Sequence, residues 1–197
     1  MAYTTAADYA WLTEQYEDLL EAYCVTLVQG LGPEELLTAL GAEPAGRITG
    51  VSGLAEPSFE HDRSFVRVAA VDDWSLMVEY NGYLGVTDKA MLPVSQGRTV
   101  VSHFRNVNAV DHFCWYRDGA VRLHFEPLFA YDRDGSHPDE LLTEMRDLGF
   151  ALSDEEEPDP DHTEAAFALA HRITGIRLTP GLFASAEFRC GLATVPR

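Results

Sequence analysis

Polar side chains near the ends of two expected strands are the part of this chain best suited to binding or chemistry. Glu79 and Asn81 end one strand, while Arg105, Asn106 and Asn108 end another and enter the next connection. If these ends lie side by side, Glu79 and Arg105 can pair and the asparagine amides can hydrogen-bond a peptide or ligand. The alternative is turn-forming asparagines beside a surface ion pair that contributes little to stability.

An enzymatic reading of the same region is a second hypothesis. In it, Glu79, His103 and Arg105 form the site of a small hydrolase or transferase, with a carboxylate of perturbed pKa beside the histidine. Ser102 and His103 are adjacent in a strand and point to opposite faces, so they cannot form a nucleophile–base pair. The sequence has no phosphate-binding loop and no nucleophile elbow. We therefore favour a non-enzymatic protein and predict no catalytic residue and no cofactor.

The hairpin around Asp118-Gly119 allows side chains to be assigned to faces from the sequence. A two-residue turn there pairs Trp115 with Arg122 and Phe113 with His124. The expected core face carries His112, Cys114, Tyr116, Val121, Leu123 and Phe125. The opposite face carries Phe113, Trp115, Arg117, Arg122, His124 and Glu126, with Trp115 and Arg122 placed for a cation–π contact. Helix 163–174 either covers this second face as another core layer, which we favour, or leaves it open to a partner.

Residues that could ligate a metal do not have the spacing of a metal site. Cys24, Cys114 and Cys190 are far apart and embedded in apolar segments, which indicates buried thiols in a reducing cytoplasm. The predicted hairpin register places His112 and His124 on opposite faces and so excludes them as a ligand pair. We expect no metal.

Acidic residues dominate the charge of the chain and gather in one stretch. The 197 residues carry a formal net charge of −18, and 132–164 alone holds thirteen Asp or Glu against Arg133 and Arg146. This acidic stretch would repel nucleic acid and attract a basic partner, although acidic surfaces often serve solubility alone. No apolar run is long enough for a membrane span, and the N-terminal sequence lacks the pattern of a signal peptide.

Periodicity and turn residues predict an α+β protein, a mostly antiparallel β-sheet with helices packed on it. We expect a single domain over 1–197, with a C-terminal helical segment at 150–197 after an acidic linker at 153–161. Strands are expected at 22–28, 64–71, 74–80 and in the 98–127 block, and an irregular loop at 43–63. Helices are expected at 33–40, 138–148, 163–174 and 181–186, with helical turns within 8–21.

Four segments resemble an uncharacterised family from high-GC Gram-positive bacteria, a domain of unknown function. They are Ala22–Ala42 (AYCVTLVQGLGPEELLTALGA), Trp74–Gly85 (WSLMVEYNGYLG), Val100–Pro127 (VVSHFRNVNAVDHFCWYRDGAVRLHFEP) and Pro138–Phe150 (PDELLTEMRDLGF). The resemblance implies a bacterial cytoplasmic protein and transfers no catalytic residue.

The sequence thus favours a cytoplasmic protein-binding module, of the adaptor type or the immunity type that inhibits a toxin, acting on a partner with a basic surface. Neither nucleic acid nor a membrane is an expected partner. The residues predicted to contact the partner are Trp74, Glu79, Asn81, Arg105, Asn108 and Trp115.

Overall fold

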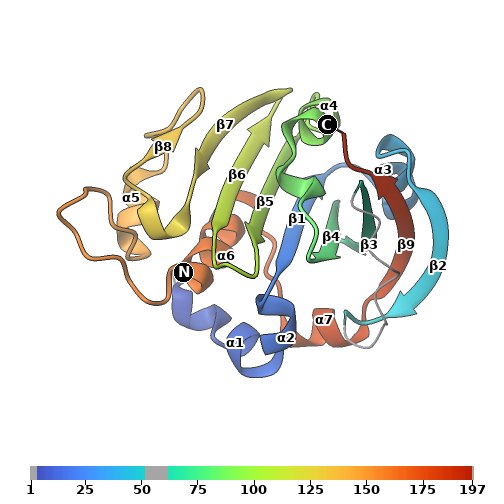
Figure 1. The fold of residues 1–197 in the computed structure, drawn as a ribbon, viewed down its shortest axis with the longest axis horizontal. Helices are drawn as coiled ribbons and strands as arrows, with labels where there is room; N and C mark the ends of the chain where they lie inside the picture. Colours follow the sequence, from blue (N-terminus) through green and yellow to red (C-terminus); the bar gives the residue numbers. More distant parts are fainter. Residues whose placement is uncertain (1–3, 52–61, 197) are drawn as a thin grey trace.

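A single nine-stranded sheet organises the protein, and each pair of neighbouring strands in it is antiparallel. The computed structural model describes residues 4–51 and 62–196. The strands are β1 (Tyr23–Gln29), β2 (Glu43–Thr49), β3 (Arg63–Val71), β4 (Trp74–Tyr80), β5 (Thr99–Arg105), β6 (Asp111–Arg117), β7 (Ala120–Phe125), β8 (Arg133–Asp134) and β9 (Glu187–Thr194). Their order across the sheet is β2-β9-β3-β4-β1-β5-β6-β7-β8 (Figure 1).

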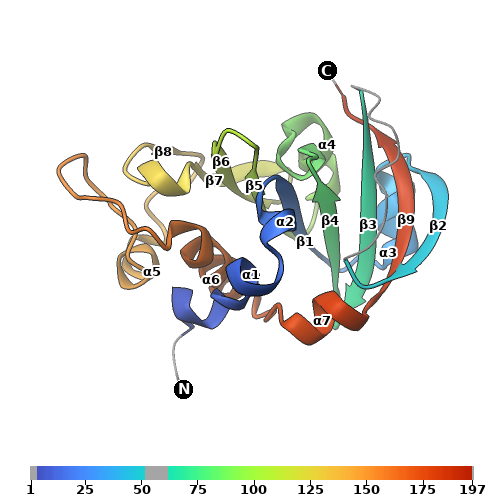
Figure 2. The same cartoon turned by 60° about the horizontal axis from the view of Figure 1, so that its bottom comes forward.

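Short helices cover both faces of the sheet, which confirms the predicted α+β class. They are α1 (Trp11–Gln15), α2 (Glu17–Leu20), α3 (Pro33–Ala39), α4 (Asp88–Val94), α5 (Leu142–Asp147), α6 (His162–Thr174) and α7 (Pro180–Ser185), with 3-10 turns η1 (Ala6–Tyr9), η2 (Leu84–Val86) and η3 (Pro127–Phe129). One core layer lies under α1, α6 and α7, which share one side of the sheet in Figure 2. A second layer lies under α3, η2 and α4.

The alternation of side chains along β1 explains why both faces need cover. Val25 and Leu27 point into the first core layer, whereas Val28 points into the second. Six of the seven β1 residues are buried, as expected for a strand at the centre of a sheet covered on both sides. The sequences of the central strands are therefore nearly continuous apolar runs.

The C-terminal segment contributes a strand as well as the expected helices α6 and α7. β9 lies between β2 and β3, although more than 110 residues separate it from either in the chain. It gives β2 a partner, so residues 43–49 form an edge strand and not the predicted irregular loop. The remainder of that predicted loop, at 52–61, lies outside the described residues. The pattern missed β2 because its composition is that of a loop and its partner is distant in sequence.

The predicted pairing of β6 with β7 is correct beside the turn and wrong beyond it. Arg117 faces Ala120 and Tyr116 faces Val121, but Trp115 faces Leu123 because Arg122 is an extra residue in a β-bulge. The bulge is held from outside the hairpin. The carbonyl oxygens of Val121 and Arg122 accept hydrogen bonds from the backbone N–H groups of residues 136 and 137.

The bulge changes which β7 side chains share a face. Leu123 and Phe125 join Phe113 and Trp115 in the first core layer, where Phe167 of α6 also lies. Phe113 and Trp115 are therefore buried as a second core layer, as the favoured prediction expected, and α6 contributes side chains to that layer. The predicted core face is wrong for Leu123 and Phe125, which lie in the opposite layer from Cys114 and Tyr116.

Arg122 makes the predicted cation–π contact despite the changed register. Its guanidinium carbon lies 5.2 Å from the centroid of the Trp115 ring. Its Nε and Nη2 also donate to the two carboxylate oxygens of Glu140, at 2.6 and 2.9 Å. The same residue is thus the extra residue of the bulge, lies over the ring of a buried tryptophan and links β7 to the segment that precedes α5.

Candidate functional site

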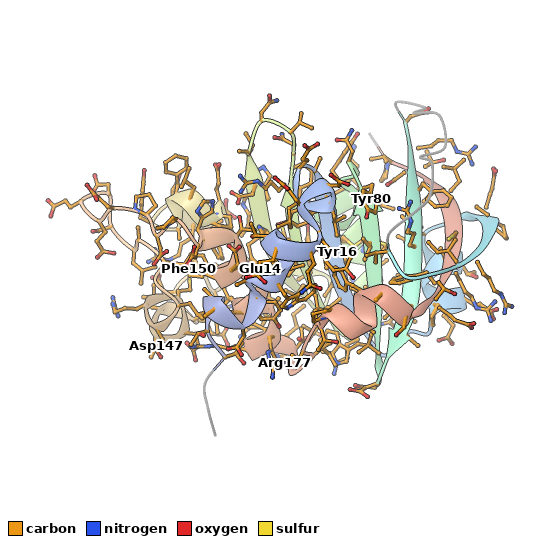
Figure 3. The ribbon with its side chains drawn as sticks, turned by 90° about the horizontal axis from the view of Figure 1, so that it is seen from below. Glu14, Tyr16, Tyr80, Asp147, Phe150 and Arg177 are labelled. Atoms are coloured by element: carbon orange, nitrogen blue, oxygen red, sulfur yellow. The ribbon has the colours of Figure 1, made fainter. Side chains whose placement is uncertain are left out.

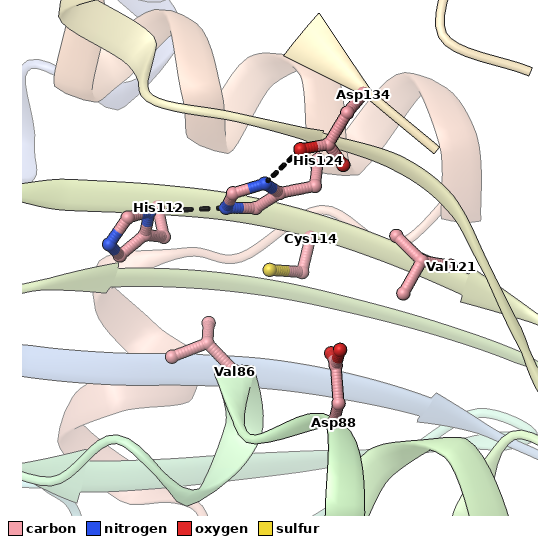
Figure 4. A pocket seen from close by; sticks show the side chains of 7 residues that line it. All are labelled: Val86, Asp88, His112, Cys114, Val121, His124 and Asp134. Atoms are coloured by element: carbon pink, nitrogen blue, oxygen red, sulfur yellow. Dashed lines mark hydrogen bonds and ion pairs between the residues drawn. The ribbon is translucent and has the colours of Figure 1, made fainter. Parts of the chain in front are cut away.

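A surface pocket of about 320 Å³ opens between β6, β7 and β8 on one side and η2 with α4 on the other (Figure 4). The residues that line it carry two carboxylates, two imidazoles, one thiol and two valines: Val86, Asp88, His112, Cys114, Val121, His124 and Asp134. The bulge at Arg122 places His124 here, because without it the β7 alternation would turn that side chain to the other face. This pocket is the candidate functional site.

Three of the lining side chains form a hydrogen-bonded chain. His124 Nδ1 lies 3.3 Å from Asp134 Oδ2, and His124 Nε2 lies 3.1 Å from His112 Nδ1. A carboxylate only accepts hydrogen bonds, so His124 Nδ1 must donate and its Nε2 must accept when the ring is neutral. His112 Nδ1 then donates, which leaves a lone pair on His112 Nε2. The register had predicted His112 and His124 on opposite faces, and that prediction is wrong.

The α4 side of the pocket also carries a hydrogen-bond acceptor, the carboxylate of Asp88. Asp88 at the start of α4 accepts a hydrogen bond from the Tyr116 hydroxyl at 3.2 Å. Cys114 is buried on the pocket floor, and burial raises the pKa of its thiol to about 12. A thiol with that pKa is not a nucleophile at neutral pH. The pocket therefore has the chemistry of a binding site for hydrogen-bond donors.

A second polar cluster lies on the opposite face of the sheet, buried beneath the N-terminus of α6. Asp111 is completely buried, and its Oδ2 lies 3.8 Å from His103 Nε2, 3.7 Å from Arg105 Nη1 and 3.7 Å from His162 Nε2. These separations are too long for hydrogen bonds, and neither Asp111 oxygen has a hydrogen-bond partner among residues 4–51 and 62–196. Tyr23 hydroxyl completes the cluster at 3.0 Å from His103 Nδ1. The Asp111 cluster as a whole links the β5–β6 connection to the start of α6.

Glu79 is buried and has a structural role, so it forms no part of the protein surface. Its buried carboxylate accepts hydrogen bonds from the backbone N–H groups of Leu84 and Gly85, both at 3.0 Å, and from the Ser64 hydroxyl. Burial raises the pKa of this carboxyl, although those hydrogen bonds oppose the rise. Glu79 therefore fixes η2, and η2 positions Val86 and the start of α4 at the pocket.

The structure separates the residues that the sequence grouped as a partner-contact set. Trp74, Glu79 and Trp115 are buried, with at most 6% of each residue exposed, whereas Asn81 and Asn108 are exposed and Arg105 is half-buried. Arg105 donates to Thr163 on α6 at 3.0 Å. None of the six lines the candidate pocket. In this conformation the two tryptophans and Glu79 offer no surface to a partner.

The predicted enzymatic trio is likewise not brought together. Residues paired across neighbouring strands share a face, and Tyr23 on β1 pairs with both Tyr80 and Arg105. Glu79 pairs with Cys24, the next residue along β1, and so projects to the opposite face from Arg105. Asp111 takes the position beside His103 and Arg105 that Glu79 was expected to hold. The register of β4 and β5 on β1, the strand between them, decides this outcome.

A buried histidine in the Asp111 cluster and a half-buried one in the pocket give an expected pH dependence. Burial lowers the pKa of His103 and of His112 below the usual value of 6.5. Their contribution to stability is then present above pH 6.5 and is lost as the pH falls through the lower folded-state pKa values, because unfolding releases imidazoles that take up protons. The free energy of unfolding should decrease from pH 7 to pH 5, by at most about 1.4 kcal/mol per pH unit for each histidine.

Urea unfolding at pH 7, 6 and 5 measures this slope. His112→Gln should flatten it, whereas His137→Gln, at an exposed position, should leave it unchanged. A His112→Gln variant with the full wild-type slope would contradict the assignment of His112 as a neutral, half-buried group.

The acidic stretch occupies one end of the molecule. β8, α5 and the loop that precedes α6 lie together there in both Figure 1 and Figure 2, and Asp147 lies on α5 at the same end (Figure 3). Its carboxylates are largely exposed, and only some are paired, as in the Arg133–Asp139 bridge at 2.8 Å. Phe129 and Tyr131, directly before it, are about 40% exposed and contact each other edge to face. Exposed aromatic rings beside carboxylates suit a cationic partner.

Two features of the site have little sequence signal. Asp134 lies in the two-residue strand β8 and Asp88 at the start of α4, and aspartate is a common residue in short turn-like segments and at helix starts. The pairing of His112 with His124 depends on a bulge that contains no glycine and therefore leaves no mark in the pattern. Among the described residues, no three His, Cys, Asp or Glu side chains are arranged to hold a metal ion, and no helix is long and apolar enough to cross a membrane.

Fold and site together define an α+β protein with a doubly covered antiparallel sheet and a small acceptor-lined pocket. The chain belongs to a family of unknown function (DUF6461), whose model matches residues 2–197. Comparison with curated proteins and with solved structures gave no match.

Proposed function

We propose that this protein is a non-enzymatic, cytoplasmic protein-binding module of bacterial origin, of the adaptor or toxin-inhibitor type, whose acidic stretch receives a partner with a basic surface. The observation that carries the proposal is the gathering of exposed carboxylates at one end of the molecule, next to the exposed pair Phe129 and Tyr131. Carboxylates attract and orient a basic surface, and aromatic rings supply contact area and cation–π contacts.

In the part of the chain that the structure describes, some carboxylates of the acidic stretch are paired with arginines and others are not, and the unpaired ones support a role in binding a partner. Arg122 and Arg133 neutralise Glu140 and Asp139, so those carboxylates have a structural use. Asp154, Glu155 and Glu157 are exposed on the loop before α6, and they have no salt-bridge partner within 4–51 and 62–196. Like charges held close together on a loop repel one another, and a basic partner relieves that repulsion.

Neutralising this loop should weaken binding of a basic peptide about tenfold. The change is Asp154→Asn, Glu155→Gln and Glu157→Gln together, and the probe is a fluorescein-labelled twelve-residue peptide of alternating arginine and glycine. Fluorescence anisotropy measures its Kd at 50 mM and 500 mM NaCl. Wild-type affinity should fall at high salt, because the Debye length shortens and the exposed charges are screened.

The matched control removes the same number of charges elsewhere: Glu14→Gln, Glu17→Gln and Asp18→Asn, all exposed on α1 and α2. It should change Kd less than twofold. Equal losses for the two triple variants would mean that net charge alone attracts the peptide, and the proposed binding surface would be rejected. Wild type and loop variant can then be compared as baits in the native lysate, washed at rising salt, to identify the partner.

A further inference from the structure

The pocket between β6–β8 and α4 is lined by groups that all accept hydrogen bonds or are apolar. Asp134 and Asp88 contribute carboxylates, and the hydrogen-bond order Asp134–His124–His112 leaves the lone pair of His112 Nε2 as the free imidazole acceptor. Tyr116 already donates its hydroxyl proton to Asp88. A ligand of this pocket must therefore supply the donors.

The charge of the lining selects a cation. None of the seven described lining residues is Lys or Arg, and with neutral imidazoles the two carboxylates leave a charge of −2. Burial lowers the pKa of His112, which keeps a competing positive charge off that ring at neutral pH. Two carboxylates on opposite sides of a concave site hold a planar cation with several donors better than a point charge.

The shape of the pocket fits the end of a long side chain. Val86 and Val121 form apolar walls on the two sides, and Cys114 lies on the floor between them (Figure 4). A volume of about 320 Å³ holds a guanidinium group with its methylene stem, and the valines can pack against that stem. Asp134 belongs to the acidic stretch as well as to the pocket, so the two surfaces are continuous.

We infer that this pocket is the anchor site for an arginine side chain of the basic partner, gripped between Asp88 and Asp134. The inference rests on the proposed function for its occupant. It adds a defined contact to a surface that otherwise attracts by charge alone, and a buried arginine is a frequent anchor of protein interfaces. The Asp134–His124–His112 chain serves to orient Asp134 toward the incoming guanidinium.

The pocket is tested with a single residue, free of any peptide context. The probe is N-acetyl-arginine amide, and binding is followed by NMR from the ring resonances of His112 and His124 during titration. N-acetyl-citrulline amide has the same shape without the charge and should bind at least tenfold more weakly. N-acetyl-lysine amide, with its free ε-ammonium group, tests whether a point charge suffices, and we expect weaker binding than for arginine.

Two pocket variants and one control complete the test. Asp88→Asn and Asp134→Asn should each lower the affinity for N-acetyl-arginine amide about tenfold, while Glu14→Gln, exposed on α1 and outside both the pocket and the acidic stretch, should leave it within twofold. Circular dichroism and thermal unfolding verify that each variant is folded. Equal binding of the arginine and citrulline probes, or wild-type affinity in both Asp variants, would overturn the inference.

The outcomes separate this inference from the proposed function. If the arginine probe binds and the loop charges prove irrelevant to the basic peptide, the pocket stands and the acidic stretch is not the binding surface. If the peptide binds through the loop charges and the probe shows no selective binding, the partner is attracted by charge but not anchored in this pocket.

Discussion

Replacing Asp111 by alanine is expected to lower the free energy of unfolding by about 3 kcal/mol, because it removes the buried carboxylate that lies among three positively charged or protonatable groups. Arg105 would lose its buried counter-charge, and His103 would remain enclosed with an unsatisfied Nε2. The value lies at the lower end of the range for broken buried pairs, since the Arg105 side chain is 24% exposed and keeps some hydration. Urea unfolding at pH 7 measures the loss.

Asp111→Asn and Asp139→Ala are the matched comparisons. The asparagine keeps the size of the side chain and removes its charge, so a loss close to that of alanine would assign the effect to electrostatics and not to a cavity. Asp139 pairs with Arg133 at the surface, where its removal should change stability by less than about 1 kcal/mol. A loss below 1 kcal/mol for Asp111→Ala would show that the cluster does not hold the β5–β6 connection to α6.

Replacing Gly85 by alanine is expected to destabilise the protein by about 3 kcal/mol through a steric clash. A Cβ at this position would lie 2.0 Å from Thr26 Oγ1 and 2.7 Å from Cys24 Sγ, both fully buried on β1. η2 cannot move away freely, because the N–H groups of Leu84 and Gly85 are bonded to Glu79. Overpacking of a rigid interior therefore has its full effect here.

Gly181→Ala is the control for the Gly85 substitution. Gly181 lies in α7, and an added Cβ would have no atom closer than 3.9 Å. Alanine is a better helix former than glycine, so this variant should be unchanged or more stable by up to about 1 kcal/mol. Adding Thr26→Ala to Gly85→Ala should restore part of the lost stability, since it removes the nearest clashing atom. If Gly85→Ala alone has wild-type stability, η2 is not fixed by Glu79 as described.

Sequence patterns were sufficient for elements stabilised by their own residues. β1, β3 and β4 are apolar runs bounded by turn residues, and α3 begins with Pro33 after Gly32 as predicted. α7 has the expected N-cap, because the Thr179 hydroxyl accepts a hydrogen bond from Leu182 N at 3.1 Å. α5 is shorter than the predicted helix 138–148 and begins only at Leu142.

Patterns failed where a distant segment decides the local geometry. β2 is a strand only because β9 lies beside it, and the bulge at Arg122 is stabilised by backbone N–H groups of Ser136 and His137. One extra residue in a strand reverses the facing of every side chain beyond it. A local pattern contains no information about such a partner, so the predicted separation of His112 from His124 was wrong.

The sequence by itself determined the α+β class, the apolar central strands and the acidic stretch, because hydrophobic period, turn chemistry and charge are local properties. Only the tertiary structure decided which polar residues meet. It placed Glu79 on the opposite face from Arg105, gave Asp111 to the buried cluster, and brought His112, His124 and Asp134 together in the pocket. The physical reason is that strand register and one bulge, both fixed by contacts between distant segments, assign each polar side chain to a face.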